Sequence, residues 1–235
     1  MAEQYKIIAE QDNSTVVARY ETSKHNRHCY QSEAELERWL IDQLQLQGYE
    51  YPRIRNEQEL LENLRVQLGK ANDTVYSDAE WKKILKEIAG DTLTMEDKAA
   101  MIQRANTAVV IERDNGINAN VHLVHKDNIF KNRLQVINQY VPEGGTHSNR
   151  YDVTILVNGL PLVHIELKKR GVSIREAFNQ INRYARESFW AGEGMFDYIQ
   201  LFIISNGTYT KYYSNTTRYA REKEGQESEG TEQLV

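Results

Sequence analysis

Three charged residues in the second half of the chain have the types and spacing to act on a phosphate group. Asp152 opens one predicted strand, and Glu166 and Lys168 stand two positions apart on the next, so their side chains leave the same face. Two converging carboxylates favour a hard divalent cation such as Mg²⁺, and a nearby ammonium can orient water or stabilise negative charge. The chemistry that this triplet suggests is hydrolysis of a phosphodiester.

The register of the predicted hairpin decides whether Asp152 lies beside Glu166. Asn158-Gly159, between the two strands, is a strong hairpin signal. Opposite residues of an antiparallel pair share a face, so a connection with an odd number of residues, such as 158–160, sets the two carboxylates across from each other. A two-residue turn would rotate Asp152 to the other face unless a β-bulge restored the register.

The same spacing also allows a purely structural interpretation. A Glu-x-Lys sequence on a strand is most often a surface ion pair, here between Glu166 and Lys168 or Lys169, and such pairs add little stability. Only the motifs that accompany the triplet can favour catalysis over this alternative.

Histidines offer weaker candidates for a site. His122 and His125 stand three apart on a predicted strand, which would put them on opposite sides, so we do not expect them to bind one metal ion. His164 shares the predicted face of Glu166, but a hydrogen-bonded histidine within the sheet is the favoured interpretation.

Hydrophobic periodicity predicts helices before residue 105 and mainly strands after it. Four amphipathic helices, each opened by a capping residue with an acid three positions later, are predicted over residues 32–48, 56–68, 77–89 and 94–105. Strands are predicted over residues 107–112, 118–124, 134–141, 151–157, 162–168, 198–206 and 208–213, with another helix over 173–188 and a strand or hairpin within 1–30. We therefore expect a helical lobe over residues 1–105, packed on a core over 106–220, and an acidic linker over 221–235.

The composition is that of an ordinary globular protein. The chain has 235 residues, of which 40% are hydrophobic and 27% charged, and this excludes the disordered and membrane-spanning classes. The single cysteine, Cys29, excludes an internal disulfide and a multi-cysteine zinc site, and no Gly-x-x-x-x-Gly-Lys loop for ATP occurs. The N-terminal residues lack the pattern of a signal peptide, so we expect a cytoplasmic protein with no membrane partner.

The distribution of charge is more informative than the net charge of -5. Basic and acidic residues number 13 and 19 in residues 1–100, 14 and 10 in residues 101–220, and 2 and 5 in residues 221–235. Phosphate binding depends on Lys and Arg, so the basic middle segment is compatible with a nucleic-acid site that the average charge would argue against.

The order of motifs around the triplet resembles the PD-(D/E)xK nuclease superfamily. Asp152 precedes Glu166-Leu167-Lys168 on a hairpin, and the helix that follows carries Gln180 and Tyr184, similar to the Gln-x-x-x-Tyr element of RecB-like nucleases. These two residues are four apart and share one helix face. One departure is Tyr151, at a position before the metal-binding Asp that is often Pro in the superfamily.

Further stretches resemble the N-terminal endonuclease domain of the restriction, or R, subunit of type I restriction enzymes. They are residues 47–50, 134–140, 157–163 and 201–207, and the resemblance runs from about residue 23 to residue 213. It implies an α/β fold with a restriction-endonuclease-like core, in which a central mixed β-sheet is flanked by helices, and a helical N-terminal lobe.

The resemblance also implies roles for individual residues. Asp152 and Glu166 would bind Mg²⁺, which Mn²⁺ can replace, and Lys168 would assist the attacking water. An acid on the first helix is a further metal contact in many relatives, and Glu37 is the best-placed candidate, with Glu33 second.

Residues around the Gln-x-x-x-Tyr element complete the implied site. Gln180 and Tyr184 would support the metal or the DNA. Lys169 and Arg183 are the first candidates for contacts with DNA phosphates.

The implied function is that of a Mg²⁺-dependent endonuclease domain which cuts double-stranded DNA after ATP-driven translocation. The helicase-type motor and its ATP would lie outside this chain, beyond the acidic linker, and the partners would be modification (methyltransferase) and specificity subunits. The alternatives are a RecB-like exonuclease or modification-dependent nuclease, an RNA-processing nuclease, and a non-catalytic DNA-binding or docking module with the same fold. A requirement for a free DNA end would identify an exonuclease, and an intact fold without Mg²⁺ binding would favour the docking module.

Overall fold

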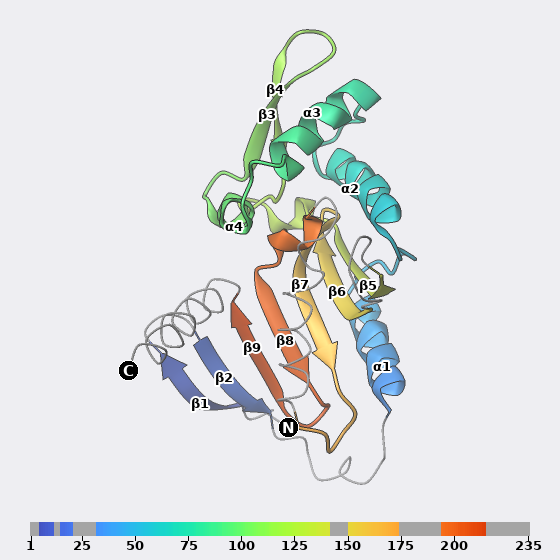
Figure 1. Cartoon of the computed structure of the whole chain (residues 1–235), viewed down its shortest axis with the longest axis vertical. Helices are drawn as coiled ribbons and strands as arrows, with labels where there is room; N and C mark the ends of the chain where they lie inside the picture. The colour runs from blue at the N-terminus through green and yellow to red at the C-terminus, as the bar shows by residue number, and fades with distance from the viewer. Residues whose placement is uncertain (1–4, 12–14, 21–31, 142–149, 174–193, 215–235) are drawn as a thin grey trace, which may run out of the picture.

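The computed structural model describes residues 5–11, 15–20, 32–141, 150–173 and 194–214. Its elements, in which η denotes a short 3₁₀ helix, are β1 (Tyr5–Gln11), β2 (Thr15–Tyr20), α1 (Glu33–Leu46), α2 (Glu57–Ala71), α3 (Asp78–Ala89), α4 (Met95–Gln103), β3 (Ala108–Glu112), β4 (Asn118–His122), η2 (Ile129–Lys131), β5 (Leu134–Tyr140), β6 (Tyr151–Val157), β7 (Leu160–Leu167), η3 (Met195–Tyr198), β8 (Leu201–Ser205) and β9 (Thr210–Ser214). Figure 1 shows their arrangement. In the described residues no helix is long and apolar enough to cross a membrane.

The four predicted helices of the first half are confirmed, and their first turns show why they begin where they do. Ser32, Ser77 and Thr94 each accept a hydrogen bond from the backbone N–H three residues on, while the acid there bonds back to the capping residue's N–H. Asn56 caps α2 through its side chain. These bonds satisfy backbone donors that a helix start otherwise leaves unpaired, so the local sequence is sufficient to set each start.

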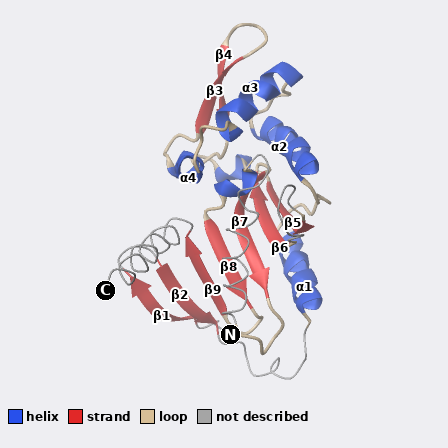
Figure 2. Cartoon of the chain, viewed as in Figure 1, coloured by secondary structure: helices blue, strands red, loops and turns tan. Residues whose placement is uncertain are grey.

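A mixed five-stranded sheet forms the centre of the molecule, in the order β5-β6-β7-β8-β9 (Figure 2). Only β7 and β8 run parallel, and the other neighbours are antiparallel. The strands predicted over 107–112 and 118–124 pair with each other as the separate β3–β4 ribbon, and the predicted N-terminal hairpin is β1–β2, which lies beside β9. The strand predicted over 198–206 begins only at Leu201, because η3 precedes it.

Two hydrophobic clusters hold the helices on the sheet. The smaller one joins Leu36, Ile41 and Leu44 of α1 to residues of β5, β6 and β7. The larger one continues from α2, α3 and α4 through the β3–β4 ribbon into the sheet and η3. The helices and the sheet therefore bury a common apolar surface, as α/β layers do.

The turn between β6 and β7 is docked into this larger cluster. Asn158 and Gly159 both have positive φ, at 52° and 86°, as a two-residue hairpin turn requires. The Asn158 side chain is fully buried, where it donates to the carbonyl of Leu123 and accepts from the N–H of Arg133. A Cβ atom on Gly159 would lie 2.6 Å from Cα of Leu64 in α2, so only glycine lets the turn approach the helix this closely.

We predict that Gly159→Ala lowers the free energy of unfolding more than Gly116→Ala does. Gly116, in the β3–β4 turn, has a φ of 79° and open space where a Cβ would be, so its substitution costs about 1–2 kcal/mol of backbone strain alone. Gly159→Ala adds a steric conflict with α2 worth about 1–3 kcal/mol. Urea denaturation followed by circular dichroism measures both losses, and equal losses would show that the turn does not press on α2.

Candidate active site

The three predicted charged residues lie together where β6 begins and β7 ends, and a β-bulge brings them to the same face. The turn has two residues, and a register shift follows it: Val157 pairs with Leu160 and Leu156 with Pro161, but Ile155 pairs with Val163. Leu162 is therefore an extra residue on β7, a β-bulge. Beyond the bulge Val153 pairs with Ile165, so Asp152 lies across from Glu166. Of the two routes that the sequence left open, a three-residue connection or a two-residue turn with a bulge, the structure has the second, and Asp152 lies on the face of Glu166 as both routes require.

Burial separates this cluster from a surface salt bridge. Glu166 has no exposed area, Lys168 is 9% exposed, and the Lys168 ammonium lies 3.3 Å from Oε1 of Glu166. Asp152 accepts a 2.9 Å hydrogen bond from the backbone N–H of Leu167. A buried charged pair costs desolvation energy and is a poor way to stabilise a fold, so the solvated ion-pair ladder is excluded.

The two carboxyl groups hold protons more tightly than ordinary acids do. Burial first, and then the charge of Glu166, raise the pKa of Asp152 to about 7. Burial also raises the pKa of Glu166 to about 7, against the opposing effects of Lys168 and of a hydrogen bond to Asp152. Adjacent carboxylates with one nearby ammonium have an excess of negative charge, which a shared proton or a bound cation would relieve.

His164 is part of the wall around these carboxyls. It is fully buried, with its ring against Tyr151 and Phe202, and its Nε2 lies 3.5 Å from Oε2 of Glu166. Burial lowers the pKa of His164 to about 4, so the imidazole is neutral near pH 7 and does not neutralise Glu166. This agrees with the predicted sheet histidine.

A pocket of about 730 Å³ opens between α1 and the edge of the cluster, and Asp152 and Lys169 line it. The acids of α1, Glu33 and Glu37, line the same pocket. Of the two, Glu33 raises the pKa of Glu166 by its charge, and its carboxylate accepts from the N–H of Lys169. The structure thus brings both predicted helix acids to the pocket, and the charge of Glu33 has a small effect on Glu166.

Two amides that the sequence did not single out hold Glu37 in place. The side chains of Asn138 and Gln139 donate to its two carboxylate oxygens, the second at 2.6 Å. Gln139 has a φ of 56°, an uncommon conformation for a residue other than glycine, which turns its side chain toward α1 at the point where β5 faces Asp152. A polar pair ending a strand beside the predicted Asp152 strand is the signal that could have identified them.

The residues present suit a hard cation in some respects. Oε2 of Glu166 is buried and accepts no hydrogen bond from any described residue, and it stands beside the partly buried carboxyl of Asp152. A carboxylate oxygen that accepts no hydrogen bond is free to bind a cation, and Mg²⁺ prefers oxygen ligands. Among residues 32–141, 150–173 and 194–214, however, no group of three or more His, Cys, Asp or Glu side chains has the arrangement of a metal site. The candidate ligands are therefore the pair Asp152 and Glu166, completed by water.

Several predicted residues lie outside the described residues. They are Gln180, Arg183 and Tyr184, together with the helix predicted over 173–188 that carries them.

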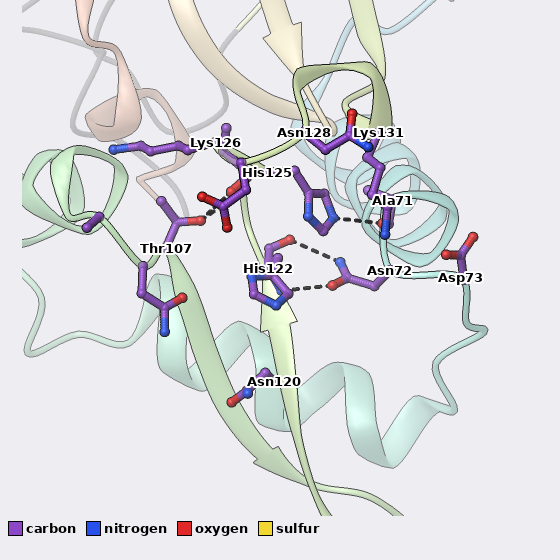
Figure 3. A pocket seen from close by; sticks show the side chains of 14 residues that line it. Ala71, Asn72, Asp73, Thr107, Asn120, His122, His125, Lys126, Asn128 and Lys131 are labelled. Carbon is purple, nitrogen blue, oxygen red and sulfur yellow. Dashed lines mark hydrogen bonds between the residues drawn. The ribbon is translucent and has the colours of Figure 1, made fainter.

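A second pocket, of about 700 Å³, lies away from the carboxylates, between the end of α2 and the segment after β4. It corrects one expectation, because the rings of His122 and His125 lie with their centroids 5.1 Å apart (Figure 3). Strand β4 ends at His122, so the alternation of faces that predicted opposite sides no longer applies at His125. His125 Nε2 lies 2.8 Å from the carbonyl of Ala71, which can only accept a hydrogen bond, so this nitrogen carries the proton.

Comparisons with known proteins give a consistent result. The family model described as "Type I restriction enzyme R protein N terminus" matches residues 30–221. The type I restriction enzyme EcoprrI endonuclease subunit of Escherichia coli is 46% identical over 215 residues, which are 91% of this chain and 68% of that protein.

Longer relatives match as well. The SsaAORF53P endonuclease subunit of Staphylococcus saprophyticus is 43% identical over 79% of this chain, and the SauMSSORF170P endonuclease subunit of Staphylococcus aureus is 41% identical over 80% of it. The matched region is 20% of each staphylococcal protein, so the chain corresponds to about a fifth of their length.

We predict that Asp152→Asn stabilises the metal-free protein more at about pH 8 than at about pH 5. The pKa of Asp152 is raised from 3.8 to about 7 in the folded protein, so folding binds a proton in this interval and the free energy of unfolding falls as the pH rises from about 4 through 7. The asparagine amide does not titrate in this range, so the variant does not lose this part of its free energy of unfolding as the pH rises. Melting temperatures in a chelator at both pH values test it, with the exposed Asp91→Asn as control. A difference from the parent that does not change with pH would contradict the prediction.

Proposed function

The chain belongs to the family of type I restriction enzyme R protein N termini, and we propose that it is a metal-dependent endonuclease domain of the PD-(D/E)xK type. Its substrate in this proposal is double-stranded DNA, and its reaction is hydrolysis of a phosphodiester bond. The names of the relatives, which are endonuclease subunits, support a nuclease.

The observation that carries the proposal is the pairing of Asp152 with Glu166 across β6 and β7, with Lys168 beside them. All three are at the wall of a pocket or buried next to it, and the carboxyls have raised pKa values. A fold seldom buries two acids and a lysine at one strand end without a functional reason, because the arrangement costs stability.

Asp152 and Glu166 would hold Mg²⁺ or Mn²⁺, and the buried Oε2 of Glu166, which has no hydrogen-bond partner among the described residues, supports this assignment. The cation would supply Lewis-acid polarisation of the phosphate and a lowered pKa for a bound water. Glu33 and Glu37 stand at the same pocket, where they can hold ordered water, and the amides of Asn138 and Gln139 fix the orientation of the Glu37 carboxylate.

Lys168 is the remaining catalytic group in this proposal. Its ammonium is 3.3 Å from Glu166 and can hold the attacking water or stabilise charge that develops on the phosphate. Lys169, which lines the pocket, is placed to contact a DNA phosphate. Gln180, Arg183 and Tyr184 keep the supporting roles that the resemblance implies for them.

The remaining activities of a type I enzyme would lie outside this chain. We propose that an ATP-driven motor in the rest of the R subunit delivers DNA to the domain, and that modification and specificity subunits complete the assembly. Delivery by a motor is compatible with a chain whose net charge is -5, because the domain then need not capture DNA by itself.

We predict that calorimetry detects Mg²⁺ or Mn²⁺ binding to the 235-residue chain and that Asp152→Ala abolishes it. Lys168→Ala leaves metal binding intact, because the ammonium is no ligand, but lowers DNA cleavage in the assembled enzyme by about 100-fold or more. Asp91→Ala, which removes an exposed acid far from the pocket in sequence, serves as the control for both measurements.

Circular dichroism establishes that each variant is folded. Equal metal binding by the parent and Asp152→Ala, or none by either, would refute the metal site and favour the non-catalytic docking module. Cleavage that requires a free DNA end would instead identify an exonuclease of the same superfamily.

A further inference from the structure

A second surface of the chain has the composition of a nucleic-acid contact. The segment that joins β4 to β5, residues 126–133, exposes Phe130 to 92% and Ile129 to 67%. Three cations of the same segment, Lys126, Lys131 and Arg133, are also exposed. We call residues 126–133 the junction surface.

Phe130 is exposed on a segment whose backbone is fixed by hydrogen bonds. Asn132 closes the segment at its base, since its side chain accepts from the N–H of His125 and donates to the carbonyl of the same residue, both at 2.8 Å. Asn158 donates to Asn132 at 2.9 Å and ties the segment to the β6–β7 turn. Asn128 accepts from the N–H of Phe130. A large apolar side chain held outward by such a frame calls for a partner.

The charges of the junction surface are available to an anion. None of its three cations forms an ion pair within the part of the chain that the structure describes, and Asp127 is its one acid. Within the described residues Lys126 donates only to the carbonyl of Arg104, and Arg104 is itself an exposed cation. The second pocket lies directly beside this surface and is lined by Asn106, Asn120 and Asn128, whose amides can both donate and accept (Figure 3).

This combination fits DNA better than a protein. Protein interfaces enrich aromatic residues but are depleted of lysine, whereas DNA contacts are made mainly by Lys, Arg and Asn side chains to phosphate and sugar. An exposed aromatic ring among such cations is a common device for entering a groove or stacking on a base. We propose that the junction surface binds duplex DNA, with Lys126 and Lys131 on phosphates and Phe130 in the groove. The proposal rests on the proposed function, because it adds a second DNA contact to the same domain.

The junction surface and the carboxylates lie at opposite ends of the sheet. Leu134, the first residue of β5, pairs with Val157 beside the turn, whereas Tyr140 at its other end pairs with Tyr151, next to Asp152 (Figure 1). A strand of this length separates its ends by about 20 Å, which is the rise of about six base pairs. Contacts at the junction surface can therefore be removed without touching the site of hydrolysis.

Fluorescence anisotropy of a labelled duplex oligonucleotide, titrated with the 235-residue chain at several salt concentrations, tests the proposal. We expect Lys126→Ala/Lys131→Ala to weaken binding and to reduce the slope of log K against log salt by about 2, as loss of two phosphate contacts requires. Phe130→Ala should weaken binding about tenfold and leave the slope unchanged. Lys82→Ala/Lys86→Ala, on exposed lysines of α3, and Ile117→Ala, on an exposed apolar residue of the β3–β4 turn, are the matched controls.

The same variants are titrated with Mg²⁺ by calorimetry, which separates this proposal from the nuclease assignment. Retained metal binding together with lost duplex binding supports a DNA contact distinct from the carboxylates. Unchanged duplex binding by Phe130→Ala and the double lysine variant overturns it, as does an equal loss in the α3 control or the absence of duplex binding by the parent at low salt. Metal binding that disappears in Asp152→Ala would stand in each of these cases.

Discussion

The register between β6 and β7 is the constraint on which the candidate site depends. The Asn158-Gly159 turn alone would direct Asp152 and Glu166 to opposite faces, and the bulge at Leu162 returns them to the same one. The pKa shifts, the bond from Leu167 to Asp152 and the contact between Lys168 and Glu166 all require this alignment. The two-residue turn and the bulge shift the register in opposite senses, so the register is fixed only if another element holds the turn in place. Helix α2, which packs against Gly159, does this.

Burial sets the pKa values of the acids in the candidate site and also lowers the stability of the fold. The rings of Tyr151 and Phe202 pack against His164, and Phe196 packs against Tyr151, so an aromatic wall covers the side of the carboxyls where His164 lies. Exclusion of water raises the pKa values of the two carboxyls and strengthens any interaction with a cation or a phosphate. It also makes the pair of ionised carboxylates unfavourable above neutral pH when no cation is bound. Tyr151, the residue before Asp152, belongs to this packing.

Local patterns in the sequence were sufficient for the helices and for the identity of the charged triplet. Ser32, Ser77 and Thr94 specify helix starts through bonds that span three residues, and such bonds depend on little else. The position of the bulge at Leu162 has no local signal, and the hairpin motif gives only the condition that a two-residue turn needs a bulge to align Asp152 with Glu166. One of the hydrogen bonds that hold Glu37 in place comes from Gln139, 102 residues away. The approach of His122 to His125 depends on where β4 ends. Contacts of this kind have no periodic signal in the chain.

The close approach of Gly159 to Leu64 also bears on how such domains change in evolution. The backbones of the helical lobe and the sheet approach closely there, with only the side chain of Leu64 beside the contact, so little room is left to absorb a mismatch. Recombination between relatives at a point between the lobe and the sheet would join two surfaces that do not fit each other. The mismatch would displace the β6–β7 turn and with it the alignment of Asp152 and Glu166. Lineages should therefore inherit the lobe and the hairpin as one unit, while the ends of the β3–β4 ribbon remain free to vary in length and composition.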